Sequence, residues 1–148
     1  WGEGKATGCT ANSAMQITAS PATIAVSINH DNYTNKCIKD TGIFAVNILG
    51  ENVDPIIIGS FGFRSGKDVD KFEGIEPLVK EFTPVLPQAM SYITCKVINT
   101  METDTHTIFL GQVTDAGNLS KDTPMTYSYY HKVVKGSTPK NAPTYKGD

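Results

Sequence analysis

Apolar residues recur at every second position along several stretches of the chain. Residues 24–28 alternate between Ile or Val and Ala or Ser, and the same alternation recurs over 44–48 and 93–97. Successive side chains of a β-strand point to opposite faces, so this period predicts strands with one face on a core. The run 107–113 is rich in β-branched and aromatic residues and predicts a further strand.

Helical signals are few and short. A helix is predicted over 35–41, with Thr34 as its N-cap and Gly42 at its end. A second helix is predicted over 56–61, behind Asp54, which is a favourable N-cap. Many strands with little helix between them predict an antiparallel barrel rather than a parallel α/β sheet.

The size and composition of the chain predict one globular domain. The 148 residues are 39% hydrophobic and 19% charged, which is enough to bury a real core. Residues 136–148 contain two prolines and two glycines and predict an extended C-terminal arm. A net charge of −2 gives no electrostatic reason to expect nucleic acid or an anionic membrane as a partner. The longest apolar run, about 56–58, is far too short to span a membrane.

The cysteines and histidines are too scattered to predict a metal site. Cys9, Cys37 and Cys95 lie far apart, are odd in number, and lack the close spacing of zinc or redox motifs. Small buried thiols are the favoured interpretation, and they suit a reducing cytoplasm. The three histidines show no short-range ligand spacing either, so no bound metal is predicted.

Three polar segments could carry chemistry. Residues 8–13 are expected to follow a strand, and their backbone N–H groups and hydroxyls could face an anion or a ring edge. Residues 27–34 run into a helix N-terminus, whose free N–H groups favour phosphate. Residues 60–68 also suit phosphate, but Gly62 and Gly66 are too close together for a P-loop. From the residues alone, ordinary turns and a capped helix are the more common explanation of such segments.

Taken in order, these segments resemble the flavin reductase-like family of FMN-binding split barrels, over nearly the whole chain. The branch with flavoredoxin and the flavin domain of high-molecular-weight rubredoxin is the most similar. The resemblance is carried by Gly8-Cys-Thr-Ala-Asn-Ser13, Ile24-Ala-Val-Ser-Ile-Asn29, Tyr33-Thr34, Phe44-Ala-Val-Asn-Ile-Leu49, Phe61-Gly62, Ser65-Gly66, Asp70-Lys71-Phe72, His106-Thr-Ile-Phe-Leu-Gly111, Tyr130-His131, Lys135-Gly136 and Asn141-Ala-Pro-Thr-Tyr145.

The resemblance implies a mainly β fold, a six-stranded antiparallel Greek-key split barrel with a few short helices. It also implies a homodimer with FMN near the subunit interface and NADH or NADPH as electron donor, while the cysteine pattern predicts a cytoplasmic location. Family members have a segment ahead of the Trp1 position, so we expect an N-terminal element to be missing here. Residues 1–135 would then be the FMN-binding domain.

The resemblance further implies that the three polar segments converge on FMN. Residues 10–13 would lie along the flavin, 27–29 would contribute backbone contacts, and 32–34 would close the phosphate side. His106, the candidate catalytic residue, would lie with Tyr130 near the open face where hydride arrives. The implied FMN contacts are Thr10, Ala11, Asn12, Ser13, Ser27, Ile28, Asn29, Asn32, Tyr33, Thr34, Phe61, Gly62, Ser65, Gly66, Lys71, Phe72 and Tyr130.

Several functions are compatible with this resemblance. The favoured one is an NAD(P)H-dependent flavin reductase-like oxidoreductase, in which hydride passes directly between stacked rings and no side-chain acid or base is indispensable. A bound-FMN electron carrier to a rubredoxin or flavo-diiron partner is the first alternative. An oxidase of the pyridoxamine-phosphate type is disfavoured, because Arg64 is the only arginine. A non-catalytic β-barrel binding module is the remaining alternative.

Overall fold

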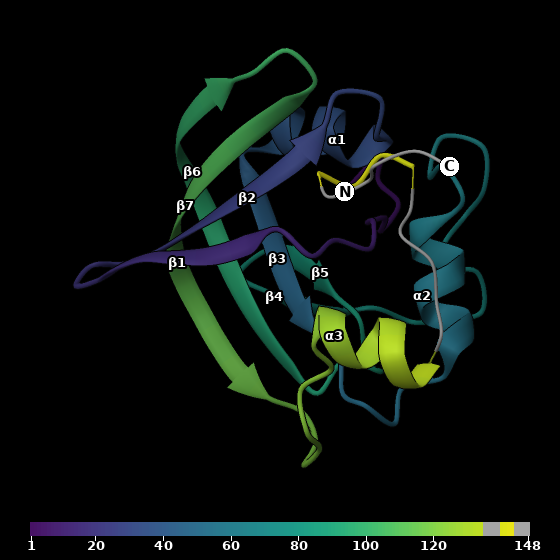
Figure 1. Cartoon of the computed structure of the whole chain (residues 1–148). Helices are drawn as coiled ribbons and strands as arrows, with labels where there is room; N and C mark the ends of the chain where they lie inside the picture. Colours follow the sequence, from purple (N-terminus) through teal and green to yellow (C-terminus); the bar gives the residue numbers. More distant parts are fainter. Residues whose placement is uncertain (135–139, 144–148) are drawn as a thin grey trace.

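The fold is organised by a curved, five-stranded antiparallel sheet with the strand order β1-β2-β7-β6-β3 (Figure 1). The computed structural model describes residues 1–134 and 140–143. A hairpin of two short strands forms a second sheet. The strands are β1 (Ala14–Ala19), β2 (Ala22–Asn29), β3 (Ile43–Ile48), β4 (Leu78–Lys80), β5 (Thr83–Val85), β6 (Ser91–Glu102) and β7 (His106–Asn118).

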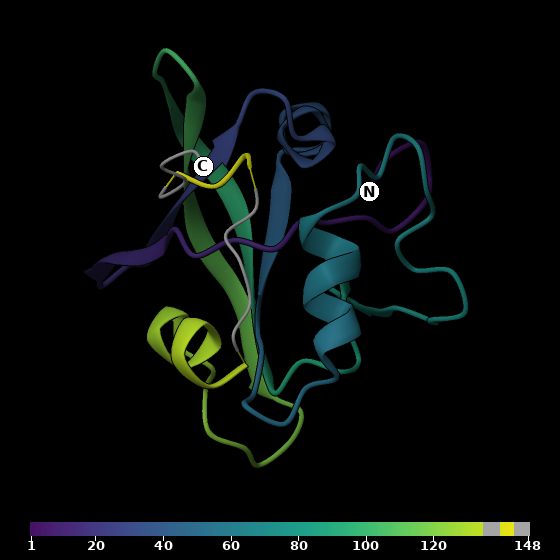
Figure 2. The same ribbon diagram turned by 45° about the vertical axis from the view of Figure 1, so that its right-hand side comes forward.

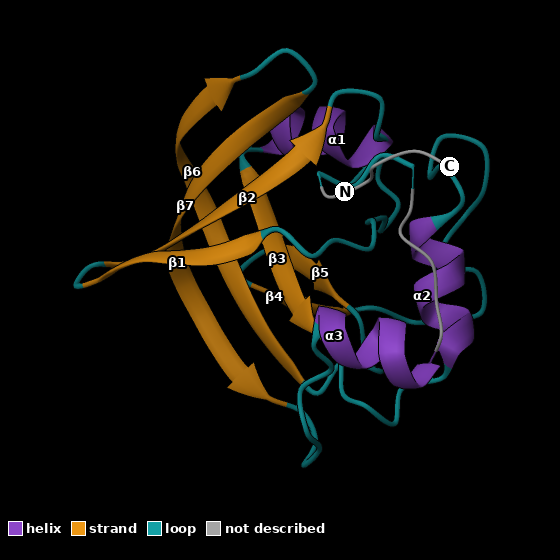
Figure 3. Cartoon of the chain, viewed as in Figure 1, coloured by secondary structure: helices purple, strands orange, loops and turns teal. Residues whose placement is uncertain are grey.

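The helices lie around the sheet, as Figure 3 shows by colour. Helix α1 connects β2 to β3, and helix α2 follows β3. Helix α3 follows β7 and continues into a π-helical turn, η1. Their bounds are α1 (Tyr33–Thr41), α2 (Pro55–Gly62), α3 (Tyr127–Tyr129) and η1 (Tyr130–Val134). No helix among the described residues is long and apolar enough to cross a membrane.

The predicted mainly β, antiparallel fold is confirmed, but the number of strands is not. The described residues form seven strands in two sheets, where six strands were predicted. The additional strands have no readable alternation, because β4 and β5 are three residues long and β5 contains Pro84. Residues 8–13 also lead into β1 and do not follow a strand, contrary to the sequence-based expectation.

Two hydrophobic clusters hold these elements together. One lies on the sheet and includes Ile24, Val26 and Ile28, whose alternation on β2 is confirmed, together with Phe44 and Phe109. The other joins helix α2 to the loops beside it, and its core residues are Ala6, Ile57, Phe61, Phe72, Leu86 and Ala89. Figure 2 shows the segment before β1 running from the sheet to α2, so it connects the two clusters.

The helix ends agree with the sequence except at one cap. Asp54 accepts a hydrogen bond from the Ile56 N–H at 3.0 Å, which confirms it as the N-cap of α2. Gly42 ends α1 in the left-handed conformation, with φ of 72°. The N-cap of α1 is Asn32 rather than Thr34, so Thr34 lies in the first turn of the helix.

The predicted C-terminal arm, 136–148, falls mostly outside the described residues. In its described part, the side-chain amide of Asn141 donates to the Asn32 side-chain oxygen at 3.2 Å. The chain therefore returns to the N-terminal end of α1 after passing along α3.

Candidate functional site

The first and third predicted segments meet at the C-terminal end of α2. The last carbonyls of a helix have no partner within it. Here the Thr10 N–H donates to the Phe61 carbonyl at 3.2 Å, and the Thr10 hydroxyl donates to the Ile58 carbonyl at 3.1 Å. The family resemblance implies that Thr10 lies beside the flavin, and in the structure its side chain fixes the position of the turn.

Lys71 also joins residues 8–13 to the C-terminal end of α2. Its ammonium donates to the carbonyls of Gly8 and Phe61, at 2.8 Å each. The residue is only 6% exposed. Burial lowers the pKa of Lys71, and the nearby Cys9 thiol acts in the opposite direction. The rings of Phe61 and Phe72 pack edge to face beside Lys71, with their centroids 5.3 Å apart. Both residues are buried, so they support the site from within the core.

The first segment also contacts the second. The Ser13 hydroxyl donates to the Ser27 carbonyl at 2.8 Å. The buried side-chain amide of Asn35 donates to the Ile28 carbonyl at 3.0 Å, so helix α1 is tied to the end of β2. Asn29 accepts from the Asp31 N–H at 2.8 Å and shapes the turn that follows. Sequence reasoning missed Asn35, because a polar residue early in a helix carries no distinct signal.

The N-terminus of α1 has no side-chain cap. The Asn32 carbonyl accepts the Asn35 N–H at 3.0 Å, but the Asn32 side chain makes no cap hydrogen bond, and the first turn contains no acidic residue. The first N–H groups of a helix lack intrahelical partners and favour an anion. Burial raises the pKa of the Cys9 thiol beside this end, while the Thr34 hydroxyl and Lys71 act to lower it.

A cradle for a polar group lies next to this helix end. The Thr7 hydroxyl oxygen is buried and has no hydrogen-bond partner among the described residues. Gly66 lies so close to Thr7 and to the Tyr33 ring that a Cβ there would overlap the Thr7 hydroxyl. Buried polar atoms are almost always paired, so this hydroxyl is a candidate donor to a bound ligand. Thr7 was missed from the sequence, since it precedes the segment that carried the motif.

His106 lies at the edge of the same region. It is opposite Asn29 in the pairing of β2 with β7. Its Nδ1 atom is 2.7 Å from the Thr105 hydroxyl, while its Nε2 atom is buried and has no partner in the part of the chain that the structure describes. A hollow of about 140 Å³ is lined nearby by Asn29, His30, Asp31, Asp104 and Thr105. The ring is therefore held through its Nδ1 atom.

The structure thus brings most of the predicted contacts together, but not all. Ala11 and Asn12 lie exposed on the turn between Thr10 and Ser13. Tyr130 follows α3, which starts where the Met125 N–H donates to the carbonyl of Leu49, just beyond β3. Both views place α3 at the opposite end of the sheet from the start of β7 (Figures 1 and 2). Within one chain, Tyr130 and His106 therefore lie apart.

Glu102 connects three elements beside His106. Its carboxylate contacts His30 Nε2 at 2.7 Å and Lys39 Nζ at 3.1 Å. It also accepts from the hydroxyl of Thr107, which is fully buried on β7. Hydrogen bonds from Lys39, Thr107 and His30 hold the pKa of Glu102 below its usual value of 4.5.

We expect Glu102→Gln to lower the urea midpoint of unfolding slightly at neutral pH. A carboxyl whose pKa is lowered by folding stabilises the native state above its unfolded pKa, and this contribution disappears as pH falls through the folded pKa. The difference between variant and wild type should therefore be largest above about pH 4.5 and vanish in more acidic buffer. Urea titrations at several pH values measure it. A difference that stayed constant down to pH 3 would contradict a role for the carboxylate charge.

Comparison with known families places this geometry among flavin proteins. The sequence model described as "Flavin reductase like domain" matches residues 2–137. The match includes all three converging segments and His106.

Two characterised relatives are similar over nearly the whole chain. The chain is 43% identical to high molecular weight rubredoxin of Moorella thermoacetica, over 93% of this chain and 61% of that protein. It is 37% identical to a ferric-chelate reductase (NAD(P)H) of Archaeoglobus fulgidus, over 96% of this chain and 85% of that one. The chain therefore spans about three fifths of the first relative and most of the second.

Among solved structures, the chain is similar to flavoredoxin from Methanosarcina acetivorans. The TM-score is 0.74 at 26% identity, and the alignment covers 83% of this chain and 69% of the other. This agreement supports the split-barrel arrangement, with its second sheet and peripheral helices.

Proposed function

Because the chain belongs to the flavin reductase-like family, we propose that it binds FMN non-covalently and transfers electrons to it from NADH or NADPH. Flavin supplies the hydride and one-electron chemistry once bound, and the protein supplies binding, orientation and electrostatics. The chain spans only part of one of these relatives, so the physiological acceptor is part of the proposal.

One observation supports a flavin with a phosphate group, such as FMN, as the ligand. The uncapped N-terminus of α1, the unpaired Thr7 hydroxyl and the Gly66 cradle lie together, where the three polar turns meet. Helix N–H groups and a hydroxyl are donors that suit a phosphate. A chain with net charge of −2 can bind phosphate in this way, because the donors are local and need no bulk positive charge.

The remaining residues receive roles on this basis. We assign the ring and ribityl contacts to the backbone of residues 10–13 and 27–29, and the phosphate contacts to Thr7, to the first turn of α1 and to residues 65–66. Phe61 and Phe72 shape the wall, since their side chains are buried. The contact predicted for Tyr130 stays a prediction, because its helix lies at the far end of the sheet.

The test is a flavin titration of the purified protein. We expect FMN to bind with a shift of its visible absorption bands and quenching of its fluorescence, and riboflavin to bind more weakly because it lacks the phosphate. Protein that takes up neither flavin would overturn the proposal and favour a binding module without a flavin.

His106 is proposed to orient the electron donor through its Nε2 atom. Direct hydride transfer needs no proton from this ring, so we expect His106→Ala to lower kcat by less than the roughly 100-fold that general acid–base catalysis usually supplies. Stopped-flow reduction of the FMN-loaded variant by NADH and NADPH measures this effect. Complete loss of reduction, with FMN still bound, would show that a proton from His106 is required.

The similarity to high molecular weight rubredoxin favours a second function, a bound-FMN electron carrier for an iron protein. Steady-state kinetics separate the two. A reductase turns over free FMN in the presence of NADH or NADPH. A carrier reduces only its tightly bound FMN and needs a redox protein such as a rubredoxin for turnover.

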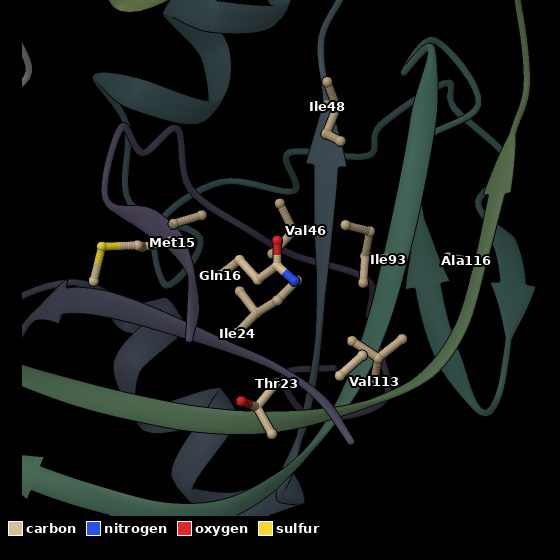
Figure 4. Close-up of a pocket in the computed structure, with 11 residues that line it drawn as sticks. Met15, Gln16, Thr23, Ile24, Val46, Ile48, Ile93, Val113 and Ala116 are labelled. Carbon is tan, nitrogen blue, oxygen red and sulfur yellow. The ribbon is translucent and has the colours of Figure 1, made fainter. Parts of the chain in front are cut away.

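We also propose a homodimer, supported by an apolar groove on the sheet. The groove has a volume of about 460 Å³ and contains none of the predicted flavin contacts. Side chains of Ile24, Val46 and Val113, from three strands, face the same space in Figure 4. Met15 and Ile17 extend this apolar surface on β1, and both are exposed. Light scattering after gel filtration should give twice the mass of one chain, and a monomer would refute the dimer.

A cytoplasmic location is part of the same proposal. Cys9, Cys37 and Cys95 are all free thiols, which suits a reducing compartment.

A further inference from the structure

Lys71 is a buried cation whose hydrogen-bond partners are main-chain carbonyls. Its Nζ atom donates to the Gly8 and Phe61 carbonyls at 2.8 Å each, and the residue is 6% exposed. In the part of the chain that the structure describes, no carboxylate forms an ion pair with it. Lysine is almost never this buried unless it is paired, because removing its charge from water is costly.

The two carbonyls explain how the charge is accommodated. Phe61 lies in the last turn of α2, where the helix dipole places partial negative charge. The same Phe61 carbonyl accepts the Thr10 N–H, so the ammonium and the first turn share one acceptor. The aromatic ring of Phe61, 5.9 Å from Nζ, adds a weak cation–π contact.

These contacts give Lys71 a specific place in the site. One ammonium connects the turn at 8–13, which leads into β1, to the C-terminal end of α2. These segments are far apart in sequence, since Lys71 lies 63 residues from Gly8 and 10 from Phe61. The spacing between the two walls of the proposed flavin site therefore depends on this side chain.

On the basis of the proposed function, we infer that Lys71 is a positioning residue of the FMN site and does not neutralise the phosphate. The family resemblance suggests direct contact with the cofactor. The structure instead directs two of the three ammonium N–H groups to the protein's own backbone. Lys71 thus fixes the separation of the turn and the helix, and the flavin contacts are made by the segments that it joins.

The experiment compares two ligands that differ only in the phosphate. In Lys71→Met, we expect the affinities for FMN and for riboflavin to fall by the same factor, about tenfold or more, since hydrogen bonds from a charged donor are lost. Isothermal titration of both flavins against wild type and variant gives the two ratios. A loss confined to FMN would identify Lys71 as a phosphate ligand and overturn the inference, as would unchanged affinity for both flavins.

Controls separate positioning from general stability. Lys96→Met makes the same chemical change at an exposed site on β6 and should leave both affinities unchanged. Phe44→Leu lowers stability in the sheet cluster without removing either hydrogen bond of Lys71, and its folded form should also bind both flavins as wild type does. Weaker binding in Phe44→Leu equal to that in Lys71→Met would show that Lys71 acts only through stability, which contradicts the inference.

Lys71→Arg keeps the test decisive if Lys71→Met does not fold. A guanidinium retains the positive charge but changes the distance to the two carbonyls. Positioning predicts weaker binding of both flavins by a common factor, whereas a phosphate ligand predicts that FMN keeps its advantage and riboflavin is unaffected. Failure of wild type to bind either flavin would instead refute the proposed function, and the two failures are thereby distinguished.

Discussion

Gly66→Val is expected to weaken FMN binding by about 10- to 100-fold while leaving the protein folded. A Cβ at this position would overlap the Thr7 hydroxyl and lie 3.1 Å from the Tyr33 ring. Thr7 is β-branched and partly buried, so it has little freedom to move away. Overpacking of this kind costs about 1–3 kcal/mol. The added methyl groups would also occupy the cradle that we assign to the phosphate.

The matched control is Gly59→Ala, on helix α2. Apart from its chain neighbours and the backbone of its own helix, no described atom lies within 4 Å of a Cβ there. Alanine is favoured over glycine in a helix by about 0.5–1 kcal/mol, so this variant should bind FMN normally and unfold at a slightly higher temperature. Fluorescence titration with FMN and a thermal melt compare the two glycines. Normal FMN affinity in Gly66→Val would place the phosphate elsewhere.

Phe109→Ala is expected to lower the free energy of unfolding by about 3–5 kcal/mol. Phe109 is fully buried on β7, at the centre of the cluster that joins the sheet to α1. Its removal leaves a cavity bounded by rigid strands, which cannot collapse to fill it. Small domains have a total stability of about 5–15 kcal/mol, so much of it would be lost. Urea denaturation followed by circular dichroism measures the change.

Met101→Ala is the control for this prediction. Met101 lies on β6 in the same hairpin, but its residue is 63% exposed. Surface substitutions away from special features usually change stability by less than about 0.5 kcal/mol. Equal destabilisation by the two substitutions would indicate that the hairpin as a whole, and not the buried ring, sets stability.

The sequence predicts those parts of the fold whose signals are local. The alternation over 24–28 and the caps at Asp54 and Gly42 depend on neighbouring residues, and the structure confirms them. Strand β1 is exposed along its whole length, so no buried face marks it in the sequence. Thr34 and Asn32 are both good caps by residue type, and only the path of the chain after β2 decides between them.

In the site, too, the local signals could be predicted and the long-range contacts could not. The three polar segments could be identified from their composition, and the structure brings them together through Thr10, Ser13 and Gly66. What each side chain contacts could not be predicted, because the partners are distant in sequence. Lys71 donates to two carbonyls, and Thr7 is identified only by its buried hydroxyl, which has no partner within residues 1–134 and 140–143.

The segments that form the proposed flavin site are far apart in sequence, so the site exists only in the folded chain. The supply of flavin should therefore affect how long the protein survives in the cell. An unfolded chain has no binding site, since the contacts that build it join residues as far apart as Gly8 and Lys71. A ligand that binds only the native state stabilises it by about 1.4 kcal/mol for each tenfold excess over its dissociation constant. With FMN as the proposed ligand, cells depleted of FMN would therefore hold a larger unfolded fraction, which proteases degrade first.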